Sequence, residues 1–328
     1  MDGGNLKNLE TTLERFSSGD RRALARLVTF VENRSAEVPR VMQTLYPRCG
    51  SARILGLTGP PGAGKSTLAD KLLKLLRAAG RRVGVVAVDP SSPFSGGAIL
   101  GDRVRMQEHF LDEGVFIRSL STRGRHGGLA RATREVVHVL DAFGFDDVLV
   151  ETVGVGQTEL DIMRLAQTTM VTLVPEAGDT IQVMKAGLLE IADVFIVNKA
   201  DREGATRLKN ELEAMLLLRP ESDWKVPVLT TQATEGRGLA EVLQAVEQHE
   251  EMRGRRPDAG REEARMREWQ EVLGDELSLR LEAFLGQADL ALLEQRVRSG
   301  EVDPYTAALE ALGNSELVTA LLEERRKG

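Results

Sequence analysis

The sequence contains few cysteines, histidines and aromatic residues, and each shortage argues against a class of protein. The single cysteine, Cys49, excludes an internal disulfide, and four histidines add little material for a transition-metal site. Aromatic residues make up 4% of the chain and the formal net charge is −7, which argues against a nucleic-acid partner. No apolar run reaches the roughly 18 residues of a membrane span, and the N-terminus lacks an apolar signal core. We therefore expect no membrane partner and a cytoplasmic location.

The most informative stretch is a glycine-rich loop between an apolar segment and a helical pattern. Residues 59–66 read GPPGAGKS, which matches the pattern G-x-x-x-x-G-K-[ST] of a phosphate-binding P-loop. Backbone N–H groups and the helix dipole converge on one point in such a loop, and its lysine reaches the β- and γ-phosphates. The chain is therefore predicted to bind a nucleoside triphosphate through Gly59, Pro60, Pro61, Gly62, Ala63, Gly64, Lys65, Ser66 and Thr67.

The chain divides into three regions by its pattern of apolar residues. Residues 1–50 show helical periodicity and predict an N-terminal helical lobe, in which Asp20 is a candidate helix N-cap. Residues 51–250 alternate short apolar runs with helical stretches, which predicts an α/β domain with a mostly parallel sheet covered on both faces. Residues 251–328 return to helical periodicity. Ligands of parallel sheets bind at the carboxyl ends of the strands, so the polar residues after each apolar run are the candidate site.

Carboxylates follow two of the apolar runs. Asp89 follows the run 83–88, Asp102 lies in the next loop, and Glu151 ends the run 148–150. With the Ser66 hydroxyl these carboxylates are predicted to hold Mg²⁺, directly or through water, although both aspartates could simply form turns. The backbone N–H of Gly154 is predicted to meet the γ-phosphate. Gln157 could orient an attacking water or make a turn contact, and the sequence does not separate these roles. The predicted catalytic set is Lys65, Asp89, Asp102, Glu151 and Gly154.

The run 194–197 leads into the sequence Asn-Lys-Ala-Asp, an N-K-x-D element. The Asp201 carboxylate can accept from N1–H and the 2-amino group of guanine, which adenine lacks. Asn198 can bond another base edge, and the Lys199 stem can lie over the ring. Guanine specificity is the prediction, and the loop Thr231, Gln232 and Ala233 is a further candidate for base contact.

Two other groups of polar residues are each compatible with more than one role. Asp179, Gln182 and Lys185 recur at helical spacing and predict a third segment near the nucleotide, a partner surface or a solvated helix start. Arg118, Arg123 and Arg125 offer positive charge to phosphate or to an anionic partner, with simple solvation as the alternative.

Taken together, these motifs resemble the MeaB/ArgK-type GTPases, chaperones of adenosylcobalamin-dependent acyl-CoA mutases. The resemblance covers nearly the whole chain, and glutamate at position 151 instead of aspartate belongs to that family's pattern. It is carried by residues 18–26, 59–67, 88–97, 101–106, 151–157, 179–190 and, more loosely, 299–308.

The resemblance implies a SIMIBI-like P-loop NTPase fold and GTP hydrolysis that is slow alone and stimulated by a mutase. This hydrolysis would gate the loading, protection and reactivation of adenosylcobalamin, a cofactor that belongs to the partner. The resemblance further implies that Asp179, Gln182 and Lys185 respond to the partner, and that residues 251–328 contribute to a homodimer. It does not choose among the acyl-CoA mutases.

Three other functions fit parts of the sequence. A metal-insertion GTPase would need more histidine or cysteine than the chain has. An ATP-dependent kinase of a transport system is opposed by the N-K-x-D element. A GTP-binding scaffold with incidental hydrolysis remains open.

Overall fold

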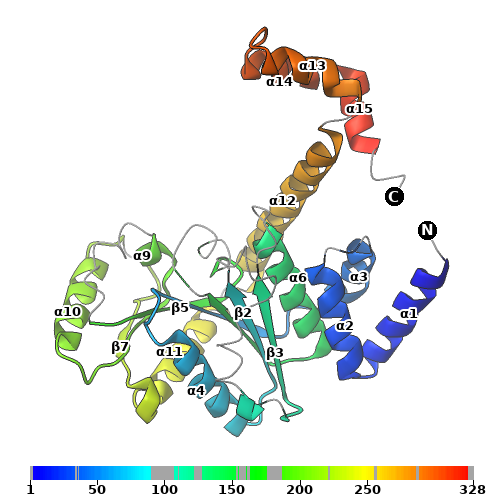
Figure 1. Ribbon diagram of the computed structural model, residues 1–328. Helices are drawn as coiled ribbons and strands as arrows, with labels where there is room; N and C mark the ends of the chain where they lie inside the picture. The colour runs from blue at the N-terminus through cyan, green and yellow to red at the C-terminus, as the bar shows by residue number, and fades with distance from the viewer. Residues whose placement is uncertain are drawn as a thin grey trace. The chain divides into compact units, whose positions relative to one another are not determined.

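The computed structural model describes residues 3–33, 35, 37–89, 107–109, 111–121, 128–152, 154, 160, 163–175, 187–220, 222–254, 257–285 and 288–323. The chain forms two compact units (Figure 1). One unit is Gly4–Arg256, and the other is Pro257–Gly328 together with Met1–Gly3.

The larger unit is built on a parallel sheet, as the apolar runs predict. Its seven strands lie in the order β3-β2-β4-β1-β5-β6-β7, and each neighbouring pair is parallel. The α/β fold class is therefore confirmed. The strand bounds are β1 Arg53–Thr58, β2 Val83–Asp89, β3 Val115–Ser121, β4 Asp147–Thr152, β5 Thr168–Leu173, β6 Val194–Val197 and β7 Val228–Thr230.

Helices cover both faces of this sheet, because alternate residues of each strand point to opposite sides (Figure 1). Leu149 of β4 packs in an apolar cluster with the helices α4 and α11, whereas Val148 and Val150 pack with α6 and the N-terminal helices. A third cluster places α9 and α10 against β5 and β6. The bounds are α4 Lys65–Ala78, α6 Gly128–Phe143, α9 Leu188–Ile191, α10 Ala205–Leu216 and α11 Leu239–Gly254.

The N-terminal helices pack on the same unit as the sheet. They are α1 Gly3–Ser17, α2 Arg21–Glu32 and α3 Val38–Leu45, and short 3-10 turns lie at Tyr46–Arg48, Gln107–His109 and Ala233–Glu235. Asp20 caps α2 by accepting from the backbone N–H groups of Arg22 and Ala23, at 2.7 and 3.3 Å, which confirms the predicted cap. The apolar residues of these helices share one cluster with β2, β4 and α6.

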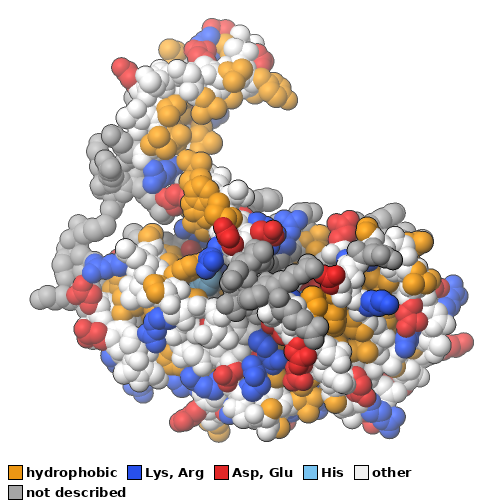
Figure 2. Space-filling model, turned by 180° about the vertical axis from the view of Figure 1, so that it is seen from behind, with side chains coloured by type: hydrophobic (Ala, Val, Ile, Leu, Met, Phe, Trp, Pro, Cys, Tyr) orange, Lys and Arg blue, Asp and Glu red, His pale blue; other side chains and the backbone are white. Residues whose placement is uncertain are grey.

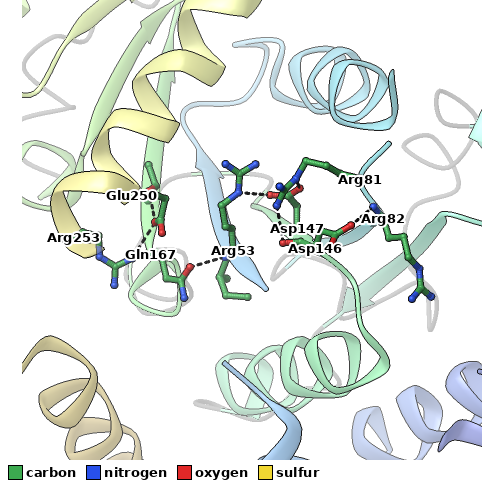
Figure 3. A network of polar contacts seen from close by, with 10 residues as sticks. Arg53, Arg81, Arg82, Asp146, Asp147, Gln167, Glu250 and Arg253 are labelled. Atoms are coloured by element: carbon green, nitrogen blue, oxygen red, sulfur yellow. Dashed lines mark hydrogen bonds and ion pairs between the residues drawn. The ribbon is translucent and has the colours of Figure 1, made fainter. Parts of the chain in front are cut away.

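Charged side chains close the amino-terminal edge of the sheet (Figure 3). Asp147 is fully buried. Its carboxylate forms ion pairs with Arg53 Nε, at 2.6 Å, and with the Arg81 guanidinium. Next to it, Asp146 accepts from the Arg82 backbone N–H at 2.6 Å. This edge lies opposite the carboxyl ends of the strands, so its charges serve the fold and leave the other edge to ligands.

The smaller unit is helical. It consists of α12 Pro257–Phe284, α13 Ala288–Arg298, α14 Pro304–Gly313 and α15 Ser315–Glu323. Arg296 ties α13 to α14 through Glu310 at 2.9 Å. None of the helices in the described parts of the chain combines the length and apolar character that a membrane crossing needs.

Candidate nucleotide-binding site

The glycine loop predicted from the sequence joins β1 to α4 at the carboxyl edge of the sheet. Gly59 has φ +146°, and a Cβ there would lie 2.0 Å from the Thr172 carbonyl oxygen of neighbouring β5. Gly64 has φ +86°, and a Cβ there would lie 2.4 Å from Asn198 Nδ2. Both positions therefore require glycine, for backbone angle and for space alike.

Lys65 is the first residue of α4 and is buried beneath the loop. Its Nζ donates to the carbonyl oxygens of Gly59 at 2.7 Å and Pro60 at 3.0 Å. The ammonium is thus held against the loop whose N–H groups and helix dipole favour an anion. Its predicted contact with the β- and γ-phosphates stays a prediction.

The structure brings together two of the predicted metal ligands. Ser66 Oγ donates to Glu151 Oε1 at 2.7 Å, and Glu151 is buried. Glu151 shares the α4 side of β4 with Leu149, two residues before it, since side chains alternate along a strand. A hydroxyl and a carboxylate side by side are the oxygen donors that Mg²⁺ prefers, so the pair fits this ion.

The other predicted ligands are placed only in part. Asp89 ends β2, one residue beyond the pair Val88–Thr152, so its backbone lies beside the end of β4. Its side chain lies outside the described residues, as does the whole of Asp102. Among the described residues no group of three or more His, Cys, Asp or Glu side chains is arranged to hold a metal.

The N-K-x-D element lies at the end of β6, where Asn198 joins three loops. Its Nδ2 donates to the Ala63 carbonyl at 2.9 Å, and its Oδ1 accepts from Thr231 Oγ1 at 3.0 Å and from the Ala233 N–H at 3.2 Å. Asn198 is buried, so these bonds brace the phosphate loop against the candidate base loop. Both lone pairs of its oxygen are used inside the protein, and the hydrogen bonds among the described residues leave one amide hydrogen for a base edge.

The two charged members of the element are open to solvent to different degrees. Lys199 has φ +54°, a left-handed conformation that a residue with a side chain adopts rarely, and it is partly exposed. Asp201 is exposed, which leaves its carboxylate accessible to a base. The next loop approaches from β7, because the Ala200 N–H donates to the Thr231 carbonyl at 3.0 Å.

The loop after β7 is closed by its own backbone. Gln232 and Arg237 form a bridge with N–H to carbonyl distances of 3.1 and 3.3 Å. Gly238 has φ +77°, and a Cβ there would lie 2.2 Å from the Thr230 carbonyl. The sequence prediction of Thr231, Gln232 and Ala233 missed Gly238, although a glycine-rich stretch after a strand is a visible sign of a tight turn.

Known proteins are similar to this chain in sequence and in architecture. The family model described as methylmalonyl-CoA mutase-associated GTPase MeaB matches residues 24–283. The chain belongs to this family. Its predicted class, a MeaB/ArgK-type P-loop GTPase, is therefore confirmed.

Individual relatives agree with the MeaB assignment. A Pyrococcus abyssi protein named as a GTPase is 46% identical over 306 residues, which are 92% of this chain and 94% of the relative. The GTPase ArgK of Escherichia coli is 38% identical over 251 residues, 74% of this chain and 76% of ArgK. A mouse protein, the mitochondrial methylmalonic aciduria type A homolog, is 33% identical over 314 residues, 88% of this chain and 75% of the homolog.

One solved structure is similar to this chain in architecture and, more distantly, in sequence. The protein described as LAO/AO transport system kinase is similar with a TM-score of 0.69 and 27% sequence identity. The match covers 94% of this chain and 97% of that chain.

One feature of this MeaB-family site is not apparent in the sequence motifs. Three charged residues on one face of α4 hold the short segments 107–109 and 111–114. Asp70 lies 3.0 Å from His109 Nε2, Lys74 pairs with Glu108 at 2.7 Å and Arg77 pairs with Asp112 at 2.8 Å. Hydrogen bonds across the last two pairs raise the pKa of Lys74 and Arg77 and lower the pKa of Glu108 and Asp112. The helix that carries Lys65 and Ser66 therefore also anchors the chain that precedes β3.

Apart from Thr67 in α4 and Gly154 after β4, the remaining predicted residues fall into two groups. Arg118 lies in β3 and its guanidinium forms an ion pair with Glu32 of α2, so it serves the packing of the N-terminal helices. The others lie outside the described residues: Arg123, Arg125, Gln157, Asp179, Gln182 and Lys185.

Proposed function

We propose that this MeaB-family GTPase is a chaperone whose GTP hydrolysis gates the loading, protection and reactivation of adenosylcobalamin in an acyl-CoA mutase. The observation that carries the proposal is the joining of Ser66 to Glu151 on one side of the P-loop and of Asn198 to Ala63 on the other. The first contact lies at the proposed phosphate end, and the second joins the P-loop to the proposed base-binding element, within a chain that belongs to a mutase-associated family.

Each site residue has a role that follows from its chemistry. Lys65 exchanges its two loop carbonyls for oxygens of the β- and γ-phosphates, which carry more negative charge. Ser66 and Glu151, with Asp89 and Asp102, hold Mg²⁺, which when bound neutralises phosphate charge. Asp201 and Lys199 select guanine, and the Gly154 N–H binds the γ-phosphate.

Hydrolysis is proposed to be slow in the isolated protein. Phosphoryl transfer depends on an oriented water and on positive charge at the transition state, and GTPases often receive one of these from a partner. The segment with Asp179, Gln182 and Lys185 is proposed to respond to the mutase, which retains the adenosylcobalamin.

The nucleotide site is tested by calorimetry on the full-length protein. Wild type is expected to bind Mg·GTP and to reject ATP, and Lys65→Ala is expected to abolish tight triphosphate binding. Asp201→Asn is expected to lower the affinity for GTP without creating affinity for ATP. Unchanged GTP affinity in Lys65→Ala would refute the site, and equal competition by ATP in wild type would refute guanine selection.

The chaperone role is tested by measuring phosphate release from GTP with and without purified acyl-CoA mutases. One mutase is expected to raise the rate, and GTP is expected to change cobalamin transfer into that mutase. A rate that no adenosylcobalamin-dependent mutase alters would reject this role while leaving the GTPase assignment intact.

A second copy of the chain is the proposed occupant of the apolar face of the helical unit. Figure 2 shows hydrophobic side chains along this unit, and α12 exposes Trp269 by 57%, Leu273 by 44%, Leu277 by 42% and Leu281 by 45%. Their spacing of four residues makes one stripe on the helix, and burying each such side chain contributes about 1.5–3 kcal/mol. Sedimentation should report a dimer for wild type and a monomer for the double variant Leu273→Glu, Leu277→Glu; a monomeric wild type would reject the proposal.

A transport-system kinase is the second candidate, because one similar structure carries that description. Such a role would require phosphate transfer to a protein substrate. The ATP competition experiment decides between the two, since a kinase that uses ATP has no need of guanine selection.

A further inference from the structure

Two buried threonines meet at the carboxyl ends of β1 and β4, beside the P-loop. Thr58 is the last residue of β1 and Thr152 the last of β4, and each has an exposed fraction of 0%. Thr152 Oγ1 donates to Thr58 Oγ1 at 2.8 Å, and both hydroxyls lie 3.3 Å from the Gly154 carbonyl oxygen. The three groups form one hydrogen-bonded cluster.

The number of hydroxyl protons in this cluster determines which group donates each hydrogen bond. A threonine hydroxyl has a single proton to donate. Thr152 lies nearer to Thr58 than to the carbonyl, so its proton goes to Thr58 Oγ1. Thr58 is then the donor to Gly154, and Thr152 orients that donor.

We propose that Thr58 and Thr152 are positioning residues for the γ-phosphate, acting through Gly154. Glycine has the greatest backbone freedom of any residue, so an unanchored Gly154 would sample orientations that turn its N–H away from the phosphate. The hydroxyl pair anchors its carbonyl and thereby limits that rotation. The inference rests on the proposed contact between the Gly154 N–H and the γ-phosphate.

The position of the pair explains why it would act on the γ-phosphate alone. The Asn198 brace holds the phosphate loop to the base loop, and both GTP and GDP need these loops. Gly154 lies on a different segment, after β4, and its predicted phosphate contact exists only in GTP. Loss of the anchor should therefore separate the two nucleotides.

The test compares the affinities for Mg·GTPγS and Mg·GDP by calorimetry. Thr58→Val and Thr152→Val remove the hydroxyl and keep the branched shape. Each variant is expected to lower the affinity for GTPγS by about five- to tenfold, which corresponds to part of the free energy of one charge-assisted hydrogen bond. The affinity for GDP should fall by less than about twofold. Thr58→Ser keeps the hydroxyl and should retain the wild-type ratio of GTPγS affinity to GDP affinity.

The matched control is Thr172→Val on β5. Thr172 is equally buried, and among the described residues its hydroxyl has no hydrogen-bond partner. This variant should leave both affinities unchanged. Circular dichroism confirms folding, and either valine variant suffices if the other does not fold.

The outcomes distinguish this inference from the proposed function. Equal weakening of GTPγS and GDP would show a merely structural role for the pair and overturn the inference. Unchanged affinities in a folded valine variant would also overturn it. If wild type binds neither nucleotide, the proposed function itself fails.

Discussion

Replacing Asn198 by alanine should damage both the stability of the protein and its affinity for every guanine nucleotide. The change removes three buried hydrogen bonds, to Ala63, Thr231 and Ala233, at 2.9, 3.0 and 3.2 Å. Each net bond contributes about 1 kcal/mol, and a buried backbone group left without its partner costs about 1–3 kcal/mol. The free energy of unfolding should therefore fall by about 3–4 kcal/mol in the nucleotide-free protein.

The affinity for GTP and GDP should fall together, by about tenfold or more, because the phosphate loop and the base loop lose their common brace. Urea denaturation measures the first effect and calorimetry the second. Thr231→Val removes one of the three bonds and should cost about 1 kcal/mol. Asp201→Asn is the contrasting variant: this residue is exposed, so stability should stay within about 0.5 kcal/mol while guanine affinity falls.

One result would refute this reasoning. If Asn198→Ala lost nucleotide affinity at wild-type stability, the amide would act by contacting the base and the brace would be energetically unimportant.

Three further predictions concern the loop, the opposite sheet edge and pH. Gly64→Ala should lower the melting temperature more than Gly62→Ala, because both have positive φ but a Cβ meets Asn198 only at position 64; equal losses would contradict this. Asp147→Asn should cost about 2–3 kcal/mol in urea, since it leaves Arg53 and Arg81 without their buried carboxylate, and GTP affinity should not change; a loss under about 0.5 kcal/mol would contradict it. Burial lowers the pKa of His249, which contacts Asp193, Thr168 and Trp224. The charges of Arg253 and Glu250 on the same helix also act on its pKa, Arg253 lowering it and Glu250 raising it. As pH falls, the unfolded chain therefore protonates this imidazole before the folded protein does, so the free energy of unfolding should decrease below about pH 6.5. His249→Gln should make this decrease smaller, and an unchanged pH profile in that variant would contradict the assignment.

The sequence predicted those parts of the fold and site that depend on local pattern. The glycine loop, the apolar strands that precede it and Glu151, and the cap at Asp20 all have their signal within a few residues. The structure confirms the parallel sheet and the cap, and it places Ser66 against Glu151.

Features that depend on distant pairing were missed. Strand β3 lies at the sheet edge, where Arg118 and Ser119 interrupt the apolar run, so no continuous pattern marks it. The amide of Asn198 contacts a carbonyl 135 positions earlier, and Thr152 contacts a hydroxyl 94 positions earlier. Nothing near either residue in the chain specifies these partners, because they meet only through strand order.

The boundary between the two units near residue 256 has a consequence for how this protein can evolve. The three apolar clusters formed by described residues of the larger unit lie between Leu9 and Val246. A chain cut after Gly254 should therefore keep a complete interior. The helical extension could be lengthened, exchanged or lost by recombination without redesigning the unit that carries the P-loop.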